Sequence, residues 1–126
     1  MELDMYLILK NKEGKTVDQN LYYWRKANQI RNWLVNHIEE FNYESNLTEY
    51  ILTKETIQNL IDDINKVLSD RSKASEVMPT SEGFFFGSTE YNEKYYHELE
   101  QTAKDLSEII NEIDFDEFDI VYDEWY

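Results

Sequence analysis

The chain has 126 residues, of which 41% are hydrophobic, so it is long enough to bury one core and too apolar for a disordered segment. It carries 12 basic residues against 27 acidic ones, a net charge of −15, which disfavours direct binding to nucleic acids and anionic membranes. It contains no cysteine, which excludes disulfides and thiolate metal sites. We expect a single domain over residues 1–126 that works in a cytoplasm, its own cell's or a host cell's.

The first forty residues predict a strand followed by a helix. Residues 3–10 read as a strand that ends in a turn at 11–14, where Gly14 is expected to take a positive φ. A helical period then runs from about Asp18, the expected N-cap, to about Glu40. The apolar face of this predicted helix consists of Tyr23, Ala27, Ile30, Leu34 and Ile38.

The middle of the chain predicts a loop at 41–47, a short strand at 50–52 and a second helix. Thr53 is the expected N-cap, and the helix is expected to end near Asp70. Its apolar stripe consists of Ile57, Leu60, Ile61, Ile64, Val67 and Leu68. Residues 71–78 have room for one more helical turn before Pro79, the only proline, ends it.

The last third predicts a helix and a strand. Ser88 or Thr89 is the expected N-cap of a third helix that extends to about Glu112, and residues 115–126 alternate as a strand with one buried face. The N-terminal strand is its natural partner. We therefore predict an α+β fold in which three main helices pack on a short antiparallel sheet that pairs the N- and C-terminal strands.

A first candidate binding site lies in the stretch GFFFGST, where Gly83 and Gly87 bracket three phenylalanines. A glycine just before a helix start allows a ligand to approach the unpaired backbone N–H groups there, and Ser88 and Thr89 add hydroxyl donors. This pattern favours a phosphate or carboxylate site. The alternative is an ordinary helix cap with a phenylalanine run that belongs to the core.

A second candidate lies in the stretch YYWRKANQIRNW. On the predicted helix Trp24, Asn28 and Arg31 share one ridge with Arg25 beside them, a set that can stack a ring and clamp an anion. The alternative is a surface helix whose cations pair with nearby acids. The candidate ligand-binding residues from both stretches are Trp24, Arg25, Asn28, Arg31, Gly87, Ser88, Thr89 and Tyr91.

Catalytic chemistry has little support in the residues. His37 and His97 are not spaced as a metal pair, and Asp62 and Asp63 are adjacent on a predicted helix and so point in different directions. No Ser-His-Asp set is indicated either. We therefore expect a protein that is not an enzyme and that uses no metal or cofactor.

The charge is unevenly distributed along the chain. Residues 1–31 hold six bases and four acids, whereas residues 98–126 hold one base, Lys104, and eleven acids. An acidic surface of this kind can dock on a basic protein groove, including one that normally holds DNA; the alternative is a solvated face that only aids solubility. Ten tyrosines and three tryptophans exceed what one small core hides, so we also expect a homo-oligomer.

Four stretches together resemble a group of small proteins encoded by phages and prophages of Firmicutes. They read MELDMYL at 1–7, YWRKANQIRNWL at 23–34, MPTSEGFFFGSTEYNEKYY at 78–96 and the aromatic end at 122–125. Glu2 stands where the group tends to have glycine, and Arg31 where it tends to have histidine, which argues against proton transfer there. The resemblance implies a viral origin, and small phage proteins are often antagonists of host defence.

Two functions follow from these observations as hypotheses. The leading one is a phage-encoded antagonist of a bacterial immune system that binds and sequesters a nucleotide-derived signal through the eight candidate residues. The other is an acidic inhibitor that binds and blocks a host defence effector, as a DNA mimic comparable to anti-CRISPR proteins.

Overall fold

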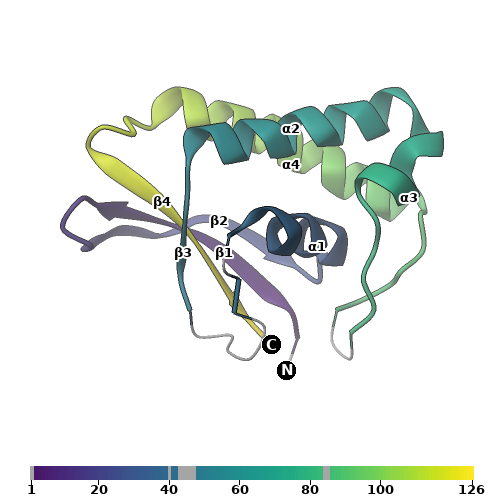
Figure 1. Ribbon diagram of the computed structural model, residues 1–126, viewed down its shortest axis with the longest axis horizontal. Helices are drawn as coiled ribbons and strands as arrows, with labels where there is room; N and C mark the ends of the chain where they lie inside the picture. Colours follow the sequence, from purple (N-terminus) through teal and green to yellow (C-terminus); the bar gives the residue numbers. More distant parts are fainter. Residues whose placement is uncertain (1, 40, 43–47, 84–85) are drawn as a thin grey trace.

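The computed structural model describes residues 2–39, 41–42, 48–83 and 86–126. Its fold is α+β, as predicted, with helices packed against one antiparallel sheet (Figure 1). The elements in chain order are β1 (Asp4–Asn11), β2 (Thr16–Arg25), α1 (Asn28–His37), β3 (Tyr50–Leu52), α2 (Lys54–Ser69), a 3-10 turn η1 (Arg71–Lys73), α3 (Ala74–Val77), α4 (Glu93–Glu112) and β4 (Phe118–Trp125).

The sheet is built around the two ends of the chain. The strand order is β2-β1-β4-β3, and all neighbours are antiparallel. β1 and β4 pair along their whole length, from Asp4 opposite Trp125 to Asn11 opposite Phe118. The predicted pairing of the N- and C-terminal strands is therefore confirmed, and both ends of the chain lie together (Figure 1).

The helices cover one face of this sheet. In Figure 1, α2 and α4 run side by side in opposite directions along the top of the molecule, with α1 below them. The described residues form four α-helices rather than three, because the turn predicted before Pro79 is a separate helix, α3, of four residues. None of these helices is long and apolar enough to cross a membrane.

Local sequence signals account for the elements that were predicted correctly. Thr53 caps α2 by accepting a hydrogen bond from the Thr56 backbone N–H at 3.1 Å, and Gly14 takes a φ of +85° in the β1–β2 turn. Each signal depends on neighbours in the chain and needs no distant partner. The apolar stripe of α2 is buried except at Leu68, which is partly buried.

The helix predicted from Asp18 is wrong over its first half. Residues 16–25 form β2, and Asp18 caps no helix but lies opposite Leu9 in the strand ladder. The helix α1 begins only after Lys26, whose φ of +57° turns the chain sharply. Tyr23, predicted on the helical core face, is 46% exposed on the outer side of the sheet.

The predicted start of the third helix is also wrong. Ser88 and Thr89 lie in the irregular segment before α4, and the N-cap is Asn92, whose side chain accepts from the Tyr95 backbone N–H at 3.1 Å. Phe86 is buried in the core, as expected of the phenylalanine run. The other two phenylalanines and most of the predicted loop at 41–47 lie outside the described residues.

Candidate functional site

The segment that leads from α3 into α4 is held on the first helix by one buried side chain. The Asn28 amide nitrogen donates to the Phe86 carbonyl at 3.0 Å and to the Ser88 carbonyl at 2.9 Å. Its amide oxygen accepts from the Ser81 N–H at 3.0 Å. Two of the sequence candidates, Asn28 and Ser88, are thereby brought together, but the role of Asn28 is to hold backbone.

A small pocket lies where this segment meets α4, and we call it the Gly87 pocket. Its volume of about 40 Å³ has room for a few water molecules or a group of phosphate size. It contains Gly87 and Ser88 together with the N-cap of α4, Asn92. A helix start with a nearby glycine therefore does occur, three or four residues later than predicted. Its lining residues are Lys26, Gln29, Gly87, Ser88, Glu90, Asn92, Lys94, Tyr95 and Glu98.

The charges around the Gly87 pocket are mixed. Lys26 and Lys94 face two carboxylates, Glu90 and Glu98. The buried Gln29 amide donates to Glu98 at 2.9 Å. Burial raises the pKa of Glu98 despite this hydrogen bond, because the surroundings disfavour its charged form. The pocket is therefore not a purely cationic anion site.

The raised pKa of Glu98 predicts how a neutral replacement behaves. Because the folded state disfavours the charged carboxylate, Glu98→Gln is expected to raise the free energy of unfolding at pH 7 while keeping an acceptor for Gln29. The gain should be fully present above the folded pKa and vanish as the pH falls below the ordinary value of 4.5. Urea unfolding of both proteins at pH 7 and pH 4 checks this, and an equal gain at both pH values would contradict it.

Gly87 has a positive φ and lies close to Lys26. Its φ is +87°, and a Cβ added there would lie 3.0 Å from the Lys26 Cβ and 3.3 Å from the Lys26 carbonyl oxygen. Gly87→Ala is therefore expected to lower the free energy of unfolding by at least about 1 kcal/mol.

Gly14 supplies a matched control for this substitution. Its φ of +85° is nearly the same, but a Cβ there meets no atom within 4 Å. Gly14→Ala should therefore show only the backbone strain, and the excess loss in Gly87→Ala measures the contact with Lys26. If both variants lose the same free energy of unfolding in urea, the close approach of the added Cβ to Lys26 does not affect stability.

The predicted ridge of Trp24, Arg25, Asn28 and Arg31 does not exist, because its first half is a strand. Trp24 faces the core with 4% exposure, and its indole nitrogen donates to the Thr102 hydroxyl at 2.9 Å. Arg25 points to the other side of the sheet and forms an ion pair with Glu2. Neither lines the Gly87 pocket, and the aromatic ring that does, Tyr95, is 4% exposed.

Arg31 is buried in an internal network instead of facing a ligand. It donates to Glu124, which is 2% exposed, through two nitrogens at 3.0 Å. The guanidinium carbon lies 4.9 Å from the centre of the Phe86 ring and 5.3 Å from that of Tyr126. Burial lowers the pKa of Arg31, but Glu124 outweighs it and the net pKa rises. This side chain joins α1, β4 and the segment before α4.

The remaining candidates make local contacts. The Ser88 hydroxyl accepts from the Glu90 N–H at 3.1 Å, and the Thr89 carbonyl accepts from the Thr80 hydroxyl at 3.0 Å. The Tyr91 hydroxyl accepts from the Thr80 N–H at 3.1 Å. All three are exposed and keep room for a ligand, so their predicted binding role stays a prediction.

Sequence reasoning missed several pocket residues. Lys26, Gln29, Lys94 and Glu98 carry no pattern that separates them from surface positions, and only the turn at Lys26 and the packing of α4 bring them together. Asn92 did carry a signal, since asparagine is a strong N-cap residue before an apolar helical period.

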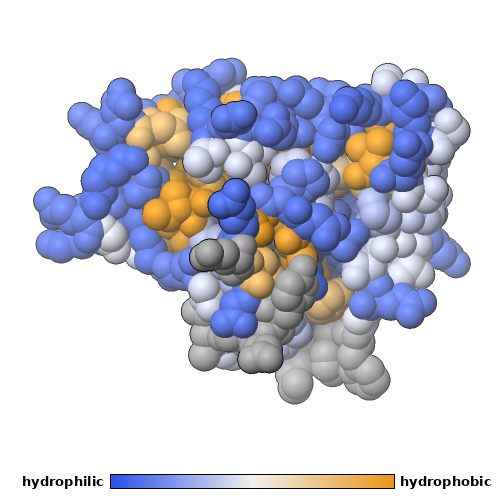
Figure 2. All heavy atoms as spheres, in the orientation of Figure 1, coloured by the Kyte–Doolittle hydropathy of each residue, from blue (hydrophilic) through white to orange (hydrophobic). Residues whose placement is uncertain are grey.

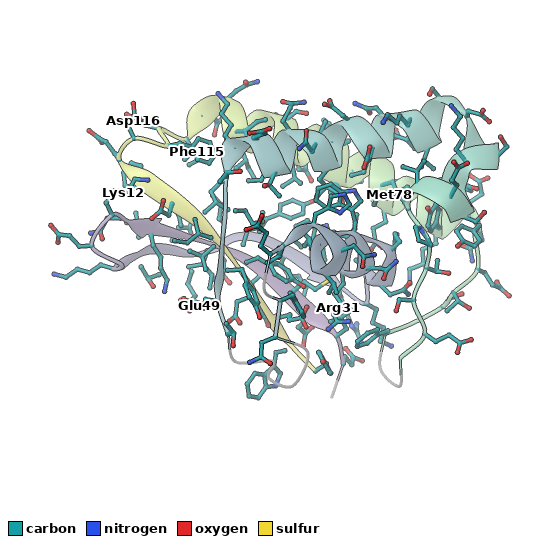
Figure 3. The ribbon with its side chains drawn as sticks, viewed as in Figure 1. Lys12, Arg31, Glu49, Met78, Phe115 and Asp116 are labelled. Carbon is teal, nitrogen blue, oxygen red and sulfur yellow. The ribbon has the colours of Figure 1, made fainter. Side chains whose placement is uncertain are left out.

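A second feature is a group of carboxylates where α4 leads into β4. We call it the acidic corner, and Figure 3 places Asp116 at its tip above Lys12 of the β1–β2 hairpin. All five members are exposed, and none forms an ion pair with another residue in the described ranges. Figure 2 shows this upper left corner as largely hydrophilic. The members are Glu108, Glu112, Asp114, Asp116 and Glu117.

The acidic corner is electrostatically unfavourable for the helix that carries it. The C-terminal end of a helix has a partial negative charge that favours cations, and each misplaced charge costs about 0.3–1 kcal/mol. The last turn of α4 contains no base, while Glu108 and Glu112 repel each other one turn apart. Asp114 has a local structural role, because its carboxylate accepts from the Asp116 N–H at 2.9 Å. Local folding does not explain the other four carboxylates, and residues that break local rules are candidates for function.

Comparisons of the chain with protein-family models, curated proteins and solved structures give no match. Within the residues that the structure describes, no group of three or more histidine, aspartate or glutamate side chains is arranged to hold a metal ion. The features that bear on function are therefore the acidic corner, the Gly87 pocket and the resemblance of the motifs.

Proposed function

We propose that the protein is a phage-encoded antagonist of a bacterial immune system that binds a basic surface of a defence effector through its acidic corner. The observation that carries this proposal is the placement of five unpaired, exposed carboxylates at a helix C-terminus that favours cations. A partner with lysines or arginines relieves this repulsion. The relief makes the free energy of binding more favourable.

The geometry supports this function better than capture of a nucleotide-derived signal, which the sequence favours. The ring and the guanidinium groups expected to hold such a ligand are buried at Trp24 and Arg31 or turned away at Arg25. The acidic corner needs no such platform. The phage origin and the role in host defence rest on the resemblance of the four motifs.

A charge-matched pair of variants tests the proposal. In the first variant the five acids of the acidic corner become glutamine or asparagine. The control neutralises five exposed acids elsewhere and so has the same net charge: Glu55, Asp62, Glu76, Glu82 and Glu100. Each protein is expressed in bacteria that carry a defined nucleic-acid-targeting immune system, and plaque formation by a targeted phage is counted.

The wild type and the control are expected to restore plaques in at least one such strain, and the corner variant is expected to fail. The effector captured by the wild type should dissociate steeply as salt rises, because the contact is between exposed charges. An active corner variant contradicts the proposal, as does a wild type inactive across the panel.

The Gly87 pocket supports a second candidate function, sequestration of a small phosphorylated signal. The pocket joins Gly87, Ser88 and the start of α4 with two lysines, and its volume suits a phosphate group while the rest of the ligand stays outside. Calorimetric titration with cyclic dinucleotides and cyclic ADP-ribose isomers tests this. We expect binding that is lost in a Ser88→Ala, Thr89→Ala double variant, and no binding at micromolar levels across the panel excludes the function.

A further inference from the structure

The outer face of the sheet carries most of the large exposed hydrophobic side chains. Of the five found among the described residues, Tyr23, Ile51 and Trp125 are on this face, with exposures of 46%, 65% and 54%. The other two tryptophans are buried, at 4% and 3%. No helix covers this side of the sheet, because α1, α2 and α4 all pack on the opposite face (Figure 1).

The strand register places aromatic rings and carboxylates side by side on this face. Tyr6 of β1 lies opposite Tyr23 on one side and Asp123 on the other. In the next row Asp4 lies opposite Trp125. These five residues form what we call the outer patch, because their neighbours in each strand point into the core. Beyond the outer patch the face continues with an aliphatic row of Ile8, Val121 and Ile51.

The outer patch contains two carboxylates, Asp4 and Asp123, and Arg25 lies opposite Asp4 on its β2 side. Neither Asp4 nor Asp123 forms an ion pair with any residue in the described part of the chain. The nearest arginine, Arg25, is already paired with Glu2. Burial and the charge of Glu49 raise the pKa of Asp123, so this carboxylate is held where a positive charge would stabilise it.

The exposed Trp125 indole and the Asp123 carboxylate are together complementary to an arginine side chain, and Asp4, which accepts a hydrogen bond from the Tyr23 hydroxyl, adds a second negative charge. The planar guanidinium stacks on an aromatic face and at the same time donates paired hydrogen bonds to a carboxylate. A lysine ammonium makes the charge contact without the planar stack. In the aliphatic row next to the outer patch, Ile8 and Val121 are buried and Ile51 is exposed, so Ile51 supplies the contact for an apolar side chain that neighbours the arginine.

We propose that the outer patch is a docking surface for an arginine-containing segment of another protein, with the guanidinium on Trp125 and its charge against Asp123 and Asp4. A second copy of the chain is a poorer occupant, since it brings the same excess of carboxylates and a net charge of −15. The surface is separate from the acidic corner, because Trp125 ends β4, about 23 Å along the strand from Phe118, and the acidic corner precedes Phe118.

The three indole N–H groups allow this proposal to be tested by NMR. Trp24 and Trp33 donate to Thr102 and Asp63 in the interior and serve as internal references, whereas the exposed Trp125 reports on the outer patch. The ¹⁵N-labelled protein is titrated with a capped glycine–valine peptide that contains three arginines. Matched peptides contain lysine or glutamate in place of arginine.

The arginine peptide is expected to shift only the Trp125 indole signal, saturably, with a Kd on the order of 0.1–1 mM from one cation–π contact and two charge pairs. The lysine peptide should bind more weakly and the glutamate peptide not at all. Asp123→Asn should weaken binding by about five-fold, the equivalent of one lost pair. Glu76→Gln, an exposed acid on α3, should leave binding unchanged.

Several outcomes overturn the proposal. The first is an unmoved Trp125 signal, and the second is a lysine peptide that binds as tightly as the arginine peptide. A third is a Trp125 signal that shifts with protein concentration alone, which assigns the face to a second copy. The acidic corner is not altered in these variants, so a negative result here does not contradict the proposed function. Likewise, a corner variant that still restores plaques would contradict the proposed function but not this inference.

Discussion

Replacement of Arg31 by methionine is expected to lower the free energy of unfolding by about 3–5 kcal/mol, because it leaves Glu124 buried without its counter-charge. Glu124 would keep only the hydrogen bond from the Tyr122 hydroxyl at 2.6 Å, which cannot neutralise it. Methionine preserves much of the side-chain volume beside Phe86, so loss of packing contributes little. Urea unfolding at pH 7 followed by circular dichroism measures the loss.

Two further variants separate the charge from other effects. The Arg31→Met, Glu124→Gln double variant removes the stranded charge, so it should recover a substantial part of the loss in the single variant. Arg25→Met removes an exposed ion pair with Glu2 and should change stability little. A single Arg31→Met variant that is as stable as Arg25→Met would show that the Glu124 network is not the structural link inferred here.

Replacement of Asn28 by alanine is expected to lower the free energy of unfolding by about 2–4 kcal/mol, because it leaves three backbone groups without partners. These groups belong to Ser81, Phe86 and Ser88, so the loosening should be concentrated in the segment before α4. Hydrogen exchange by mass spectrometry is expected to show faster exchange for peptides covering residues 79–92 than for those covering α2.

Asn32 supplies the matched control. It lies one turn further along α1 and donates a single hydrogen bond to the Pro79 carbonyl at 3.2 Å, in the same segment. Asn32→Ala should therefore cost about 1 kcal/mol or less, with little change in exchange. If both variants lose the same stability, the anchoring of this segment does not depend on Asn28. If Asn28→Ala also abolishes ligand binding in the Gly87 pocket while α1 stays protected, the pocket depends on this anchor.

Residues of β2 were predicted to be helical, and the reason for this error can be identified. The residues chosen for the helical face, from Tyr23 to Ile38, do repeat at helical spacing, and no glycine or proline interrupts them. Yet residues 16–25 are rich in the β-branched and aromatic types that favour strands, and β1 offers them a partner. Pairing with β1 makes this segment a strand rather than a helix. The spacing of apolar residues within the segment contains no information about that partner.

The prediction of a ligand-binding ridge was wrong for a related reason. The ridge of Trp24, Arg25 and Arg31 depended on one continuous helix, and the break at Lys26 sends these side chains to different faces of the molecule. The pairing of Arg31 with Glu124 joins residues 93 positions apart. A lone arginine in a sequence reads as a surface cation, because the carboxylate that permits its burial is distant in the chain.

Sequence patterns alone were sufficient to predict the α+β class, the pairing of the terminal strands, the cap and stripe of α2, and the positive φ at Gly14. Each of these depends on residues a few positions apart, or on an apolar alternation strong enough to need one buried face. Three outcomes could not be predicted in this way: residues 16–25 form a strand, α4 has Asn92 as its N-cap, and Asn28, Arg31 and Glu124 are buried. Those outcomes depend on contacts between distant segments, whose energies outweigh the local preferences of the chain.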